Sequence, residues 1–418
     1  MKFKGSKNTI AATVGNFSTT AALAVAIVTL TQFGSAENVG HFSFALAVAT
    51  PVFLLMQLRL RDVIATDLDL SAWHAYRRLS ISSNVCGAVI AGPIAFLAGL
   101  SQETIVATIL IACWKATVGV SDLVYGWHQR DGRLVDVARL QVGHSIATGL
   151  SFFIVFVATR NLAITLSVVF IVNLILLVLV DLKSIDAATG ISPSDDRRSL
   201  WPLLKRNLPL GLAGAIFSLN MILPRDQLEH SFSMVEVGLF SAIAFLARAG
   251  TPMMQAFGQT STKRLNQCVI ESNGRGFIAT LMRAVTLPLL AGLGLVVVFW
   301  VAGQPLVALL YGPAYARDPV AIVLIMAYAC LVYLSTVLTY GIIAAGRFKS
   351  QLLILSCSVL ITYFVGARLI PNSSVQGACW AVLSGATFRI LATAGVVAWS
   401  AWSMRLQSKF DFSVPGAT

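Results

Sequence analysis

The sequence predicts an all-α, multi-pass membrane protein with about 12 transmembrane helices. Of its 418 residues, 57% are hydrophobic and 11% are charged, and the mean hydropathy is +0.80. Soluble domains carry roughly 25% charged residues. A helix needs about 20 residues to cross ~30 Å of hydrocarbon, and the sequence contains many apolar stretches of about this length or longer. They are far longer than the strands of a membrane barrel. The predicted spans are 9–33, 40–60, 80–100, 103–127, 134–158, 161–182, 207–228, 236–258, 277–301, 319–345, 350–370 and 374–403.

The net charge of +12 follows the predicted topology. When the N-terminus is assigned to the cytosol, the outside turns hold only Arg160, Arg225, Arg317 and Arg368. Almost all the other cations fall in turns on the cytosolic side, as the positive-inside rule requires. We therefore expect a multi-pass inner membrane protein with both termini in the cytosol. The same placement argues against a nucleic-acid partner.

The turns are short, and the longest one divides the chain almost in half. We predict an N-terminal six-helix bundle at 1–190, a cytosolic linker at 191–206 and a C-terminal six-helix bundle at 207–418. Residues 35–47 (SAENVGHFSFALA) and 233–245 (SMVEVGLFSAIAF) share Ser, Val, Gly, Phe and Ser at positions 198 residues apart. Two halves that enter from the same side would form a parallel repeat, with a substrate site between them. Chance recurrence of small residues and Phe at helix ends is the alternative.

Three cations, Lys115, Arg248 and Arg389, fall well inside predicted spans. Counting ~1.5 Å per residue from the outer helix ends places them about 16–21 Å deep. All acidic residues fall at helix ends or in turns of the predicted spans, so none is predicted at the depth of these cations. A buried cation usually faces a partner or water, and the missing anion is plausibly a bound substrate. Snorkelling to an interface and a bond to a backbone carbonyl are the alternatives.

A polar stretch at 224–236 interrupts the second half. Arg225, Asp226, Glu229 and His230 are predicted at the outer surface, because Arg225 lies about 27 Å along a helix that starts near residue 207. They would form a hydrated turn and a periplasmic rim of the transport route. A catalytic site at Glu229 and His230 is the alternative.

The sequence contains no pattern of a cofactor or metal site. Its six cysteines form no CxxC pair and no His-spaced set, and no nucleotide-binding or hydrolase motif is present. We expect no cofactor, no metal and no catalytic residue. The basic N-terminal segment is interpreted as a retained first helix and not a cleaved signal peptide.

Several segments resemble the bacterial polysaccharide-biosynthesis membrane proteins. They are FGSAENVGHFSFALAVATP (33–51), MQLRLRDVIATD (56–67), LPLGLAGAIFSLNMILPRDQLEH (208–230) and the region 309–351 beginning LLYGPAYARD. These proteins are the Wzx-type flippases of lipid-linked oligosaccharide, within the multidrug/oligosaccharidyl-lipid/polysaccharide exporter (MOP) superfamily. The resemblance implies a MATE-like fold of two bundles around a cationic cavity. It also implies cavity arginines, for which Arg248 is the best match.

The resemblance implies a transporter and not an enzyme. Such a protein would flip an undecaprenyl-diphosphate-linked oligosaccharide from the cytosolic to the periplasmic leaflet, for exopolysaccharide or O-antigen synthesis. Its partners would be that substrate, the membrane lipids, and a polysaccharide polymerase and co-polymerase. A MATE-type drug/cation antiporter is the first alternative, although it would need a buried carboxylate. An integral-membrane enzyme of glycan assembly is the second.

Overall fold

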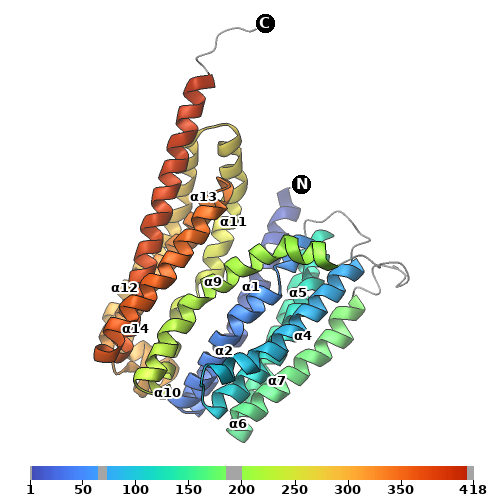
Figure 1. Cartoon of the computed structure of the whole chain (residues 1–418), viewed down its shortest axis with the longest axis vertical. Coiled ribbons are helices and arrows are strands. Elements are labelled where there is room, and N and C mark those ends of the chain that lie inside the picture. Colours follow the sequence, from blue (N-terminus) through green and yellow to red (C-terminus); the bar gives the residue numbers. More distant parts are fainter. Residues whose placement is uncertain (1, 65–72, 185–199, 412–418) are drawn as a thin grey trace. The chain divides into compact units, whose positions relative to one another are not determined.

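The computed structural model describes residues 2–64, 73–184 and 200–411, and within these it is helical and contains no strand (Figure 1). Most of the predicted linker, 191–199, lies outside the described residues. The remaining seven residues of that linker, 200–206, belong to a helix. The prediction of an all-α fold is therefore confirmed.

The first half contains six long helices and one short one. Serine and asparagine residues begin several of them, because their side-chain oxygens accept a hydrogen bond from a first-turn amide. Ser35, Ser101 and Asn161 do so for three helices. The helices are α1 (Lys2–Phe33), α2 (Ala36–Met56), α3 (Leu60–Ile64), α4 (Trp73–Leu97), α5 (Gln102–Arg130), α6 (Leu134–Thr159) and α7 (Leu162–Leu176), which continues as the π-helix η2 (Leu177–Asp181).

The second half contains helices that bend or break. Helix α12 is kinked at Ala302, and α14 turns at Ser374, whose φ is 44°. The elements are α9 (Leu200–Ser231), α10 (Met234–Arg248), α11 (Thr251–Ile270), α12 (Gly274–Tyr311), η3 (Pro313–Ala316), α13 (Pro319–Ala344) and α14 (Phe348–Asp411). The predicted spans fall on these helices, except that the eighth, 236–258, is divided between α10 and α11.

Ten segments among the described residues are long and apolar enough to cross a membrane. One of them, Lys349–Met404, contains two predicted spans that meet at the turn of Ser374. The remaining predicted span, 207–228, falls on helix α9. The chain is thus a multi-pass membrane protein, as predicted. At their predicted cytosolic ends, helix α1 extends seven residues beyond its predicted span and α11 extends twelve.

The described chain divides into two compact units. The first comprises Met1–Glu229 and Ser233–Ala242, and the second comprises His230–Phe232 and Ile243–Thr418. Aromatic and aliphatic side chains around Trp73, Tyr76 and Trp127 form one core cluster of the first unit. A cluster around Phe277, Leu281 and Val397 forms one of the second. Most of helix α9, up to Glu229, falls within the first unit. The bundle boundary at residue 207 stays a prediction.

The two repeated segments cross each other within the first unit. A Cβ atom added to Gly40 would lie 2.1 Å from the carbonyl oxygen of Met234, and one added to Gly238 would lie 1.9 Å from that of Ala36. These two contacts are equivalent under the 198-residue offset, because Ala36 corresponds to Met234 and Gly40 to Gly238. The starts of α2 and α10 therefore meet about an approximate two-fold axis, which supports duplication over chance recurrence.

Candidate cationic site

Arg248 lies at a break in the eighth predicted span. Helix α10 ends at Arg248, Ala249 and Gly250 form a turn, and α11 begins at Thr251 with Pro252 in its first turn. Proline at this position costs no helical hydrogen bond. The Arg248 side chain is exposed. Discontinuous helices near mid-membrane are where many transporters place their substrate sites.

A tyrosine from α13 closes this break. The hydroxyl of Tyr333 donates to the carbonyl oxygen of Ala247 at 3.0 Å. In a continuous helix the amide of Thr251 would donate a hydrogen bond to that carbonyl. A carbonyl without a hydrogen-bond donor in hydrocarbon is costly. Gly250 makes room for the phenol, since a Cβ atom there would lie 2.4 Å from the Tyr333 oxygen. The Ala247 carbonyl at the break therefore has a hydrogen-bond donor from within the second unit.

Arg389 lies close to the same break. Its guanidinium, on the second limb of α14, donates through Nη2 to Oγ of Ser335 on α13. The electrostatic neighbours of Arg389 include the phenol of Tyr328 and the guanidinium of Arg248. Counted from the outer ends of their helices, Arg248, Ser335 and Arg389 lie roughly 21, 24 and 21 Å along the axis. The structure thus brings together two of the three predicted cavity cations, at matching depth.

No carboxylate of the described chain lies within 4.0 Å of the Arg248 guanidinium. Two neighbouring cations repel each other, and the repulsion is strongest where water is scarce. A doubly charged anion placed between them would relieve it. Arginine binds phosphate with a planar fork of donors, which a lysine does not have. Two such forks can bind a doubly charged anion.

Lys115, the third predicted cation, is half-buried on α5 of the first unit. Its assignment to the cavity stays a prediction.

The predicted periplasmic rim lies on a helix and not in a turn. Arg225, Asp226, Glu229 and His230 all belong to α9, which continues to Ser231, and only Phe232 and Ser233 separate it from α10. Asp226 and Glu229 are half-buried, and His230 is exposed. The helix begins at least seven residues before the position that we assumed for its start. For that reason the polar residues lie further along a continuous helix than predicted.

Arg225 is buried, with only 7% of its surface exposed. Its Nε donates to Oγ of Ser241 at 2.9 Å, and its Nη1 donates to the carbonyl of Met221. The guanidinium lies over the ring of Phe240, 5.6 Å from the centroid. Ser241 and Phe240 belong to the second repeated segment, so Arg225 fixes that segment to α9 within the first unit.

A buried acid–base pair in the first unit was missed by the sequence analysis. Asp181 is fully buried, and its Oδ2 lies 3.0 Å from Nε2 of His144 on α6. The other ring nitrogen, Nδ1, lies 3.3 Å from Oδ1 of Asn173. The amide of Asn173 is oriented by its own donation to the carbonyl of Val169. Both ring nitrogens therefore face acceptors, which is the environment of an imidazolium.

Asp181 lies at the end of its predicted span, as expected, but it is buried. The residue lies within the apolar segment Leu162–Ser184, at the end of the π-helix η2. One π-turn adds a residue to the helical repeat and rotates the following side chains. The signal that could have found the pair is a histidine and an asparagine inside apolar spans, because such residues rarely lie in lipid alone.

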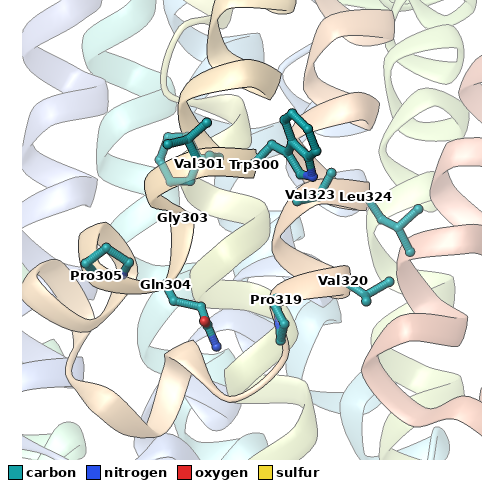
Figure 2. Close-up of a pocket in the computed structure, with 10 residues that line it drawn as sticks. Trp300, Val301, Gly303, Gln304, Pro305, Pro319, Val320, Val323 and Leu324 are labelled. Carbon is teal, nitrogen blue, oxygen red and sulfur yellow. The ribbon is translucent and has the colours of Figure 1, made fainter.

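An apolar groove also opens beside the kink of α12 (Figure 2). Its volume is about 380 Å³, and its lining includes Trp300, Val301, Pro319 and Leu324. Gln304 is polar, and its amide donates to the carbonyl of Ala316 at 3.2 Å. The groove has no charged lining residue, and it does not contain the arginines. It is suited to hydrocarbon and not to a headgroup.

Comparisons with known proteins agree with this architecture. No protein-family model matches the sequence. The chain is 23% identical over 359 residues to the capsular polysaccharide biosynthesis protein CapF of Staphylococcus aureus, across 84% of this chain and 89% of that protein. An inward-facing multidrug resistance MATE family transporter of the MOP superfamily superposes with a TM-score of 0.68 at 13% identity, covering 95% of this chain and 96% of that one.

A second solved structure is a MOP superfamily transporter from Pyrococcus furiosus, described as having a binding pocket of reverse polarity. It gives a TM-score of 0.66 at 14% identity and covers 95% of this chain and 94% of that one. The resemblance on which the sequence analysis relied is thereby confirmed. The chain is a multi-pass membrane protein with the fold of the MOP superfamily transporters, and its sequence is similar to that of a capsular polysaccharide biosynthesis protein.

Proposed function

We propose that this protein is a flippase for an undecaprenyl-diphosphate-linked oligosaccharide. It would move the substrate from the cytosolic to the periplasmic leaflet of the bacterial inner membrane, for exopolysaccharide or O-antigen synthesis. The observation that carries the proposal is the position of two arginines at matching depth in the second unit: Arg248 at the break between α10 and α11, and Arg389 bonded to Ser335 on α13, near enough for their charges to interact. The similarity to a capsular polysaccharide biosynthesis protein supports the glycan pathway.

The chemistry of the substrate matches the pair. A diphosphate carries two negative charges and several acceptor oxygens, and each guanidinium can bind two of them in one plane. Binding would replace a repulsive pair of cations by a nearly neutral assembly. Ser335 would hold Arg389 in position through its bond to Nη2. The sugar chain would need only a hydrated route, whereas the undecaprenyl chain would remain in lipid.

The break between α10 and α11 supports alternating access. A helix interrupted at Ala249 and Gly250 can bend there with little loss of hydrogen bonding, because the hydroxyl of Tyr333 already donates to the carbonyl of Ala247. A polysaccharide polymerase and a co-polymerase would take up the product outside the membrane.

We propose that the protein is not an enzyme. Glu229 and His230 are the only pair that the sequence offered for catalysis. They are consecutive on α9, so their side chains leave the helix about 100° apart. A cooperating acid–base pair on one helix would need a spacing of three or four residues.

A drug/cation antiporter is the second candidate, favoured by the buried carboxylate of Asp181. The MATE transporters whose fold the chain shares include multidrug resistance proteins. In an antiporter the carboxylate would bind the coupling cation or the drug. In a flippase it would serve the fold of the first unit.

The proposal is tested by replacing both arginines. Arg248→Ala with Arg389→Ala should leave lipid-linked oligosaccharide in the cytosolic leaflet of cells, as measured by its inaccessibility to a periplasmic ligase. Arg283→Ala is the matched control, because Arg283 is an exposed arginine on α12 of the same unit. Its export should equal that of the wild type. Equal export by the double variant would refute the cationic site.

Lysine variants distinguish the effect of the positive charges from that of the planar guanidinium geometry. Arg248→Lys with Arg389→Lys keeps both charges but removes the planar forks. We expect flipping of the diphosphate lipid in proteoliposomes to fall at least tenfold while the protein remains folded. Transport of a cationic dye by the wild type, abolished by Asp181→Asn and unaffected by the arginine variants, would instead favour the antiporter.

A further inference from the structure

Three potential metal ligands converge at the ends of α2 and α5 that the charge pattern assigns to the outside. Nε2 of His41 lies 2.9 Å from Oε2 of Glu103 and 3.7 Å from Oε1 of Glu37. One donor atom from each residue lies within 4.8 Å of the other two. His41 is 95% buried, whereas both carboxylates are exposed. A buried imidazole is thus aimed at two solvated carboxylates.

Hydrogen bonds hold the imidazole of His41 in place. Nδ1 lies 2.8 Å from Oγ1 of the buried Thr104, and that hydroxyl lies 2.9 Å from Oγ of Ser101. Nε2 is buried and has no hydrogen-bond partner of good geometry. In the tautomer in which Nδ1–H donates to Thr104, Nε2 presents a lone pair to the carboxylates, and a cation between them would relieve the repulsion. A proton on Nε2 is the alternative occupant of this position.

We propose that Glu37, His41 and Glu103 bind a divalent transition metal ion of the zinc class. A tetrahedral ion with bonds of about 2.0–2.1 Å places its ligand atoms roughly 3.4 Å apart, and the two distances from Nε2 lie on either side of that value. Imidazole with carboxylates favours zinc over calcium or magnesium, which prefer oxygen ligands alone. Thr104 acts as the outer partner that fixes the ring, as is usual for ligating histidines.

The proposed site is specific to the first half of the chain and does not depend on the proposed function. The positions that correspond to Glu37 and His41 in the second repeated segment are Val235 and Leu239, which cannot ligate a metal. Duplication of the fold therefore does not require these ligands. The ion would join α2 to α5 and leave a fourth position for water or an anionic oxygen. Its effect would be to hold the outer ends of two helices of the first unit together.

The test uses the purified full-length protein in detergent after treatment with a chelator. Zinc titration by calorimetry should show one site, and cobalt should give the visible d–d bands of a tetrahedral complex. Glu37→Gln and Glu103→Gln should each weaken zinc binding at least tenfold, and the double variant should lose the cobalt bands. These exposed residues can be changed without disturbing the core.

Glu236→Gln is the matched control, since Glu236 lies in the first turn of α10, at the equivalent end of the second repeated segment. Its zinc affinity should equal that of the wild type. His41→Asn should abolish binding, and its circular dichroism will report whether it folds. Zinc binding that is no tighter in the wild type than in the double glutamine variant would overturn the proposal. In that case the cluster holds only a proton.

Discussion

At the scale of single residues, the charged side chains inside the membrane fall into two classes. Arg225 and Asp181 are buried and are bound by neighbours within the first unit. Arg248 is exposed and Arg389 half-buried, and they lie beside each other in the second unit. The first class stabilises the fold, because each charge meets its partner when the unit forms. The second class places two cations near each other, which is the arrangement on which the proposed substrate site rests.

The pair of Asp181 and His144 gives a prediction about stability. Asp181→Ala should lower the free energy of unfolding by about 3–5 kcal/mol, because it leaves a buried imidazolium without its anion. Thermal unfolding of the detergent-solubilised protein measures the change. In the double variant Asp181→Ala, His144→Leu the charge is gone as well, so much of the loss should be regained. Additive losses in the two single variants would show that the residues do not interact.

The sequence indicated the positions of some of these residues but not the surroundings of others. The predicted spans of Arg248 and Arg389 begin close to where helix α10 and the second limb of α14 begin, so their positions along those helices agree with the prediction. The surroundings of Arg225 and Asp181 were not predicted. A linear count cannot show that Ser241 returns to meet Arg225, or that a π-turn directs Asp181 at His144. Burial of a polar group depends on its partner in space, and that partner lies on another helix.

At the scale of helices, the crossing of α2 and α10 depends on two glycines. Gly238→Ala places a methyl group on the carbonyl of Ala36, and backbone does not yield as a side chain would. Overpacking of this kind costs about 1–3 kcal/mol, and we expect Gly40→Ala to cost as much because its contact is equivalent. The matched control is Gly143→Ala on α6, where nothing lies within 4 Å of the added atom. That change should stabilise the protein by roughly 0.5–1 kcal/mol. Equal melting temperatures for Gly238→Ala and the wild type would contradict the crossing.

The helices themselves were predictable in number but not in length. Hydropathy reports only the part of a helix that lies in hydrocarbon, so it located the spans but not the ends of the helices. It could not show that α11 continues to Ile270. Nor did it distinguish a bend from a break. The interruption at Ala249 and Gly250 became visible only with the bond from Tyr333, a residue of another helix.

At the scale of the whole molecule, the orientation in the membrane remains a prediction from the charge pattern, and it can be measured. In a variant whose six native cysteines are replaced, single cysteines at positions 230 and 271 test opposite predicted faces. Both His230 and Glu271 are exposed. A membrane-impermeant maleimide added to intact spheroplasts should label His230→Cys within minutes and Glu271→Cys only after lysis. Arg225→Cys should react slowly in both cases, because the residue is buried between α9 and α10 and is not part of a hydrated rim. Labelling of Glu271→Cys from outside would show that the orientation in the membrane is the reverse of the predicted one. The direction of transport and the outward position of the His41 cluster would then have to be reversed together.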